Sequence, residues 1–179
     1  LVLIMDEVQT GMGRLGTLFG YEKFDIEPDI ITLAKGLGNG VPIGAFMSNL
    51  KTSVFEPGDH GSTFGGNVLT CAAAYAAARI IIDEKISQQA EETGEYLAEI
   101  LNKLKSRHNN IREVRGMGLL RAIEFTDDLS PVVVAAANKE GVLLNAVRPN
   151  AVRMIPPLTI TKEEIDVGVA RIEAALENI

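Results

Sequence analysis

Two apolar runs, separated by a short stretch of chain, constrain the fold of this sequence more than any other feature. Residues 1–5 and 30–34 are rich in branched apolar side chains, which is typical of strands buried in a sheet. The apolar residues of the segment 14–24 fall on one side of a helix, and Pro28-Asp29 ends that segment. Because a strand, a helix and a second strand form a β–α–β unit with parallel strands, we expect an α/β fold.

Each of these two expected strands is followed by a residue whose side chain can take part in catalysis. Asp6 follows the first strand, and Lys35 follows the second. Parallel neighbours deliver their last residues to the same edge of a sheet, and ligands of open α/β sheets bind at that carboxyl edge. A lysine amine attacks carbonyl groups, and a carboxylate keeps a ring nitrogen protonated, so the two are the pair that pyridoxal phosphate requires. We predict that Lys35 carries this cofactor and that Asp6 holds its pyridine nitrogen.

The chain after Lys35 is expected to complete one domain and to begin another. A glycine-rich loop follows the lysine, and residues 43–47 resemble a third strand. This strand should be antiparallel because the connection to it is too short for a parallel crossover. Helices are expected near 68–83 and 85–107, and the second of them links the two domains.

The pattern then changes to shorter elements, and we expect residues 90–179 to form a small α+β domain, separate from residues 1–89. Thr161 and Glu164 form a capping box at the start of a last amphipathic helix. The other elements expected here are an apolar strand pattern interrupted by glycines, a helix and two short strands, at residues 114–125, 131–140, 142–144 and 151–155.

Composition excludes several classes of protein. The net charge of −7 argues against nucleic acid or an anionic membrane as a partner, and no apolar stretch is long enough to span a bilayer. The single cysteine, Cys71, is expected to be a small buried residue, excludes an internal disulfide and fits a reducing compartment, so we expect a cytoplasmic location. With one cysteine and two separated histidines, no metal site is indicated.

Four groups of residues resemble, in order, the motifs of class-III aminotransferases, and the resemblance covers essentially the whole chain. The groups are residues 6–14 with 28–36, residues 60–67, residues 114–120 and residues 153–158. The resemblance implies that residues 1–89 are the C-terminal part of a fold type I large domain with a mostly parallel sheet. It also implies pyridoxal 5′-phosphate as the cofactor, an amino donor and 2-oxoglutarate as substrates, and a homodimer with shared active sites.

The same resemblance implies roles for further residues. Val8 would pack on the pyridine ring and Gln9 would bind the phenolic oxygen of the ring. Ser62 and Thr63 would bind the cofactor phosphate of the other subunit, although their loop has a second interpretation as a turn that caps the next helix through Asn67. Arg153 would clamp the substrate carboxylate, for which a planar guanidinium is suited.

Several alternatives stay open on the sequence. The donor implied is an ω-amino acid, N2-acetylornithine of arginine biosynthesis in the first place, with ornithine, 4-aminobutyrate and succinylornithine as alternatives. Asp6-Glu7 after an apolar run also fits the Walker B acids of a nucleotide hydrolase. Because an apolar strand opens the sequence, we expect that the chain begins within a domain, and a catalytically inert chain is the third hypothesis.

Overall fold

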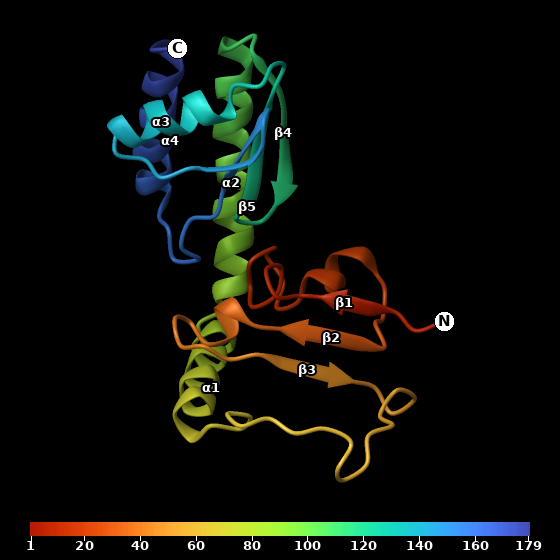
Figure 1. Cartoon of the computed structure of the whole chain (residues 1–179). Helices are drawn as coiled ribbons and strands as arrows, with labels where there is room; N and C mark the ends of the chain where they lie inside the picture. The colour runs from red at the N-terminus through yellow and green to blue at the C-terminus, as the bar shows by residue number, and fades with distance from the viewer. The chain divides into compact units, whose positions relative to one another are not determined.

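The computed structural model describes all of residues 1–179 and divides the chain into two compact units (Figure 1). Unit 1 comprises Leu1–Gln88 and unit 2 comprises Gln89–Ile179. The boundary falls within a long helix, α2 (Ile86–Arg107). No helix in the chain combines the length and the apolar character needed to cross a membrane.

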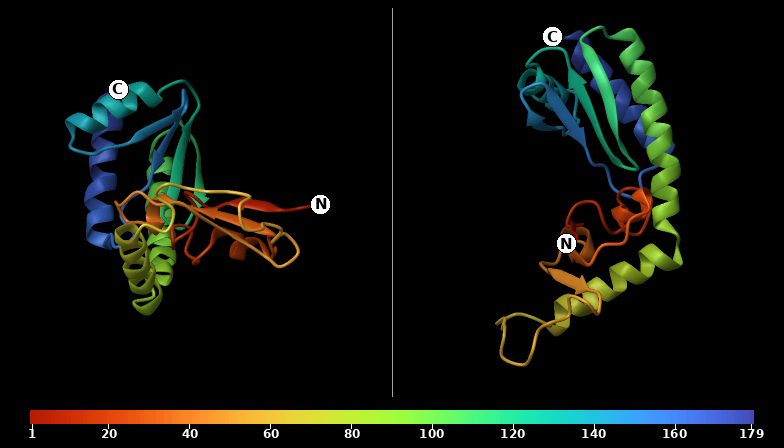
Figure 2. Two further views of the ribbon diagram at one scale, coloured as in Figure 1. Left: turned by 60° about the horizontal axis from the view of Figure 1, so that its bottom comes forward. Right: turned by 90° about the vertical axis from the view of Figure 1, so that its right-hand side faces the viewer.

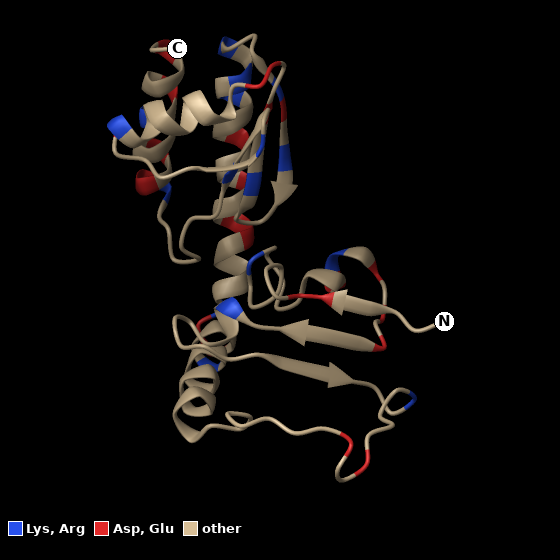
Figure 3. Ribbon diagram, in the orientation of Figure 1, with Lys and Arg blue, Asp and Glu red and all other residues tan.

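Unit 1 is built on a three-stranded sheet with the order β1-β2-β3. β1 (Ile4–Asp6) pairs in parallel with β2 (Ile30–Leu33), and β3 (Ala45–Ser48) pairs antiparallel with β2. The parallel pair and the antiparallel third strand confirm the prediction from sequence. β2 and β3 contain no charged residue, so the charges of this sheet lie at the strand ends and in the loops (Figure 3).

Two details of the predicted β–α–β unit are wrong. The first strand is shorter than residues 1–5, and Leu1 to Ile4 are exposed rather than covered on both faces. The expected helix over 14–24 is reduced to a single 3-10 turn, η1 (Gly20–Phe24). Residues 8–19 instead form turns and bends, and the Glu7 carboxylate accepts the amides of Gly20 and Tyr21 where the 3-10 turn begins.

The rest of unit 1 follows the prediction more closely. The 3-10 turn η2 (Lys35–Leu37) leads from β2 into the glycine-rich loop, and α1 (Val68–Asp83) has the expected bounds. Asn67 caps α1, since its Oδ1 accepts the amides of Leu69 and Thr70 at 3.1 and 3.2 Å. Cys71 was expected to be buried, but it is exposed because α1 buries only another side of the helix, at Ala74, Ala77 and Ile81.

Unit 2 combines a four-stranded antiparallel sheet, in the order β4-β5-β7-β6, with helices. α2 and α4 run side by side (Figure 2), and Tyr96 Oη donates to Asp166 Oδ1 across them at 2.7 Å. Helices and sheet share one core that includes Leu101, Phe125 and Val133. The elements after α2 are β4 (Ile111–Met117), β5 (Leu120–Phe125), α3 (Ser130–Lys139), β6 (Asn145–Arg148), β7 (Ala151–Met154) and α4 (Lys162–Glu177).

The sequence located the helices of unit 2 better than its strands. The capping box is confirmed, since Thr161 and Glu164 exchange hydrogen bonds at the start of α4. The continuous strand predicted over 114–125 is wrong, because Gly118 and Leu119 form a two-residue turn between β4 and β5. The strand predicted at 142–144 is also wrong, and the pairing with β7 begins at Asn145 instead.

Helix α2 and the turn between β4 and β5 approach closely at two glycines. A Cβ added to Gly94 would lie 2.3–2.6 Å from backbone atoms of Gly118, which is too close for any carbon. We therefore predict that Gly94→Ala lowers the free energy of unfolding by about 1–3 kcal/mol, through overpacking. Chemical denaturation followed by circular dichroism measures this loss.

Gly168 in α4 provides the matched control, because an added Cβ there meets no atom within 4 Å. Gly168→Ala should raise the free energy of unfolding by about 0.4–1 kcal/mol, since alanine is the better helix former. Equal stability changes in the two variants would contradict the close approach of Gly94 and Gly118.

Candidate functional site

The carboxyl end of the parallel strand pair brings two polar residues together. Asp6 is the last residue of β1 and lies beside Thr32 of β2 in the parallel register. The Thr32 hydroxyl donates to Asp6 Oδ1 at 3.2 Å, and the Val8 amide donates to the same oxygen at 3.0 Å. The carboxylate is therefore held by a hydroxyl from β2 and by an amide from the turn that follows β1.

Lys35 stands at the start of η2, just past β2, with an unusual backbone conformation. Its φ is 43°, in the left-handed region, where a residue other than glycine costs on the order of 1–3 kcal/mol. Strain of this kind persists only where the surroundings fix it, and it concentrates at functional sites. Lys35 is exposed in this chain, and its Nζ donates to Gln9 Oε1 at 2.9 Å.

These hydrogen bonds join Asp6 and Lys35 into one cluster. The Val8 amide binds Asp6, and the side chain of the next residue, Gln9, binds Lys35. Lys35 also lines a cavity of about 390 Å³ with Gly40, Val41, Pro42 and Ile43. The amine and the amide oxygen thus meet next to the turn that binds the carboxylate, and this set of groups fits a cofactor with a carbonyl carbon and a basic ring nitrogen.

Ser62 and Thr63 do not join this cluster within the chain. Both lie on an exposed loop before α1, and neither side chain makes a hydrogen bond to Asp6, Gln9 or Lys35. The capping of α1 by Asn67 is consistent with the structural interpretation of this loop. It leaves the hydroxyl groups of Ser62 and Thr63 available to another molecule.

Arg153 occupies a different part of the molecule, in β7 of unit 2. Its Nη2 donates to Asn145 Oδ1 at 2.7 Å, whereas its Nε is buried with no hydrogen-bond partner. The side chain lines a cavity of about 490 Å³ whose other walls are mostly apolar, including Leu97 and Ile155. A buried cationic donor without an acceptor is costly, so this guanidinium has unused capacity to bind an anion.

Arg121 shows the opposite arrangement and is structural. It is buried, and each of its three nitrogen atoms donates to an acceptor at 2.7–2.9 Å. The acceptors are the carbonyl oxygens of Gly116 and Gly118 and the carboxylate of Glu95. Two arginines on neighbouring strands therefore differ in whether they have donor capacity left for a ligand.

Glu7 argues against the Walker B alternative. A catalytic glutamate in that role must accept a proton from water, but the Glu7 side chain is 1% exposed. Its oxygens accept the Thr10 hydroxyl and the amides of Gly20 and Tyr21, the last two at 3.0 and 2.8 Å. The carboxylate is thus occupied by internal donors and has no access to a metal-bound nucleotide.

Two contributors to these sites were missed from the sequence. Thr32 supports Asp6, and Asn145 orients Arg153. A signal for Thr32 existed, because it is the one hydroxyl residue within the apolar strand Ile30–Leu33. Asn145 gave none, since its strand was expected to end before it.

Comparison with known proteins shows the family to which the chain that carries these residues belongs. Residues 1–176 match the family model described as aminotransferase class-III. The acetylornithine aminotransferase of Caldanaerobacter subterraneus subsp. tengcongensis is 45% identical over 180 residues, which cover 100% of this chain and 46% of the relative. The chain thus spans about half the length of the curated relatives that it matches.

Solved structures give the same result. The crystal structure of an acetylornithine aminotransferase from Elizabethkingia anophelis superposes with a TM-score of 0.93 at 39% identity, covering 100% of this chain and 46% of that chain. The ornithine δ-aminotransferase of Plasmodium falciparum superposes with a TM-score of 0.93 at 37% identity, covering 99% and 46%. The α/β fold of this chain therefore matches nearly half of each of these two enzymes.

Proposed function

This chain belongs to the class-III aminotransferases, a family that depends on pyridoxal phosphate, and we propose that the whole protein transfers an amino group from an ω-amino donor to 2-oxoglutarate. The observation that carries this proposal is the cluster of Asp6, Gln9 and Lys35 at the carboxyl edge of a parallel strand pair. In this interpretation, unit 1 is part of a fold type I large domain and unit 2 belongs to the small domain.

The residues of the cluster divide the work between them. Pyridoxal phosphate, when bound, would supply an electron sink that weakens the C–H bond at the carbon bearing the transferred amino group. Lys35 Nζ would hold the cofactor, and once free it would move the proton at the carbon that bears the transferred amine. Asp6 keeps the ring nitrogen protonated, Val8 packs on the ring face, and Gln9 binds the phenolic oxygen.

Two further groups complete the proposed site. Ser62 and Thr63 bind the cofactor phosphate of a partner subunit, which suits an exposed loop whose hydroxyls have no partner at the lysine cluster of their own chain. The protein is then a homodimer with shared active sites. Arg153 binds the substrate carboxylate, which is supported by its buried and unpaired Nε.

We propose N2-acetylornithine as the amino donor, which places the enzyme in arginine biosynthesis. The support is the identity of 43–46% to several acetylornithine aminotransferases. The likeness to ornithine aminotransferases at 36–38% identity keeps ornithine as the principal alternative. Assays of the full-length protein with both donors and 2-oxoglutarate decide between them.

The first test removes the amine of Lys35 in the full-length protein. Lys35→Ala should abolish the visible absorbance of bound cofactor and lower the transamination rate by at least about 10²-fold, since attachment and proton transfer are both lost. Lys51→Ala, at an exposed lysine of the same unit, is the control and should retain both properties. Unchanged absorbance and turnover in Lys35→Ala would refute the proposed function.

The second test exchanges the guanidinium of Arg153 for an ammonium. Arg153→Lys keeps the charge but loses the two parallel hydrogen bonds, so KM for 2-oxoglutarate should rise about tenfold with a smaller change in kcat. Arg112→Lys is the control, because Arg112 forms an exposed ion pair with Glu124 at 3.3 Å on the sheet. Steady-state kinetics that show equal KM values in wild type and Arg153→Lys would rule out the clamp.

The third test asks whether Thr63 acts across a subunit interface. Lys35→Ala and Thr63→Val each damage both sites of a homodimer, but a mixed dimer keeps one site with both residues intact. Unfolding and refolding the two inactive variants together should therefore recover about a quarter of wild-type activity, because half of the random dimers are mixed. No recovery, with dimers confirmed by gel filtration, would place Thr63 at the site of its own chain.

A further inference from the structure

The most deeply buried acid of the chain has no role in the mechanism proposed above. Glu7 lies next to Asp6, directly after β1, and its side chain is 1% exposed. Burial of a carboxylate is unfavourable unless hydrogen bonds replace the lost water, so a fully buried acid requires an explanation.

The Glu7 carboxylate closes the turn segment that follows β1. Its Oε2 accepts the amide of Gly20 at 3.0 Å and its Oε1 accepts the amide of Tyr21 at 2.8 Å, thirteen and fourteen residues further along the chain. The Thr10 hydroxyl also donates to Oε2, and the Gly11 amide donates to the backbone carbonyl of Glu7 at 3.0 Å. One side chain therefore joins Thr10, near the start of residues 8–19, to the two residues that directly follow them.

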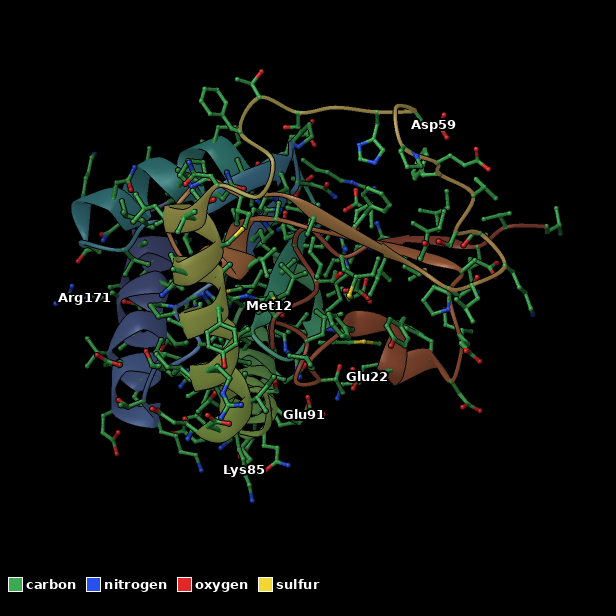
Figure 4. All side chains as sticks on the ribbon, turned by 90° about the horizontal axis from the view of Figure 1, so that it is seen from below. Met12, Glu22, Asp59, Lys85, Glu91 and Arg171 are labelled. Atoms are coloured by element: carbon green, nitrogen blue, oxygen red, sulfur yellow. The ribbon has the colours of Figure 1, made fainter.

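Packing around this carboxylate leaves no spare room. A Cβ added at Gly20 would lie 3.0 Å from both Glu7 Oε2 and a methyl carbon of Leu15, and 3.1 Å from Thr10 Cβ. Met12, labelled in Figure 4, and Leu15 are buried within the same segment. The turn segment is thus folded around the acid, and Val8 and Gln9 are its first residues.

We propose that Glu7 is a positioning residue, which closes residues 8–19 into a compact turn and so fixes Gln9 where it meets Lys35. Hydrogen bonds to an ionised carboxylate are stronger than those to a neutral acceptor, and two oxygens are needed to receive three donors. Without this closure, the backbone of Val8 and Gln9 would be held to the sheet by the Asp6 carboxylate and by the Glu7 amide, which donates to Thr32 O. The consequence for cofactor binding rests on the proposed function, whereas the closure itself does not.

Glu7→Gln tests the proposal in the full-length protein. An amide has one acceptor oxygen and directs its NH₂ group at a backbone amide, so it cannot receive the same donors. Tryptic cleavage after Arg14, followed by mass spectrometry without added cofactor, should be at least about tenfold faster than in wild type, because the segment opens more often. In an absorbance titration, the Kd for pyridoxal phosphate should rise by about tenfold or more.

Glu22→Gln is the matched control. Glu22 belongs to η1 and is labelled in Figure 4, but it is exposed and binds only the local amide of Phe19 at 3.0 Å. Its cleavage rate and cofactor Kd should stay within about twofold of wild type. If folded Glu7→Gln also stays within about twofold in both measurements, the positioning role is wrong.

Hydrogen exchange on the wild-type protein covers the case in which Glu7→Gln does not fold. The amides of Gly20 and Tyr21 should exchange as slowly as the amide of Glu7, which binds Thr32 O within the strand pair at 2.9 Å. Exchange at the rate of unprotected amides would overturn the closure. The absorbance of Lys35→Ala tests the proposed function separately. If that variant kept its absorbance, the proposed function would fail, whereas proteolysis and hydrogen exchange would still test the closure by Glu7.

Discussion

The parallel register between β1 and β2 is the constraint on which the candidate site depends. It places Asp6 beside Thr32, and it therefore makes Lys35 emerge from the same sheet edge. A slip of one residue would turn every side chain of β1 to the opposite face of the sheet and remove Asp6 from the Thr32 hydroxyl. In the turn after β1, the Val8 amide binds Asp6 and the Gln9 side chain accepts a hydrogen bond from the Lys35 amine.

Unit 2 contributes guanidinium groups from an antiparallel sheet. Its antiparallel sheet presents Arg121 and Arg153 on adjacent strands, and the environment decides which of them is available. Each nitrogen of Arg121 donates a hydrogen bond, to β4, to the turn between β4 and β5 and to α2, whereas Arg153 keeps a buried nitrogen unpaired. An acceptor from a bound ligand or an ordered water would offset the cost of that unpaired donor.

Prediction from the sequence succeeded for elements that local residue patterns determine. It failed for elements whose structure depends on contacts between residues distant in the sequence. Strand periodicity located β2, and helix-capping residues located the starts of α1 and α4, because these signals act over a few residues. The helix expected over 14–24 failed because Glu7, distant in sequence, captures the amides at Gly20 and Tyr21. Lys35 and Asp6 were found from their positions after strands, but Asn145 was not, since its role appears only when β6 pairs with β7.

The left-handed backbone of Lys35 has a consequence for how relatives of this chain can change. At a φ of 43°, glycine or asparagine would relieve the strain that lysine bears, although neither could reach Gln9 as the Lys35 side chain does. The function proposed for this chain gives a reason for lysine at this position, because that function requires an amine. Under the proposed function, a relative that had lost amine chemistry would be free to carry glycine or asparagine at this position while its sheet stayed intact.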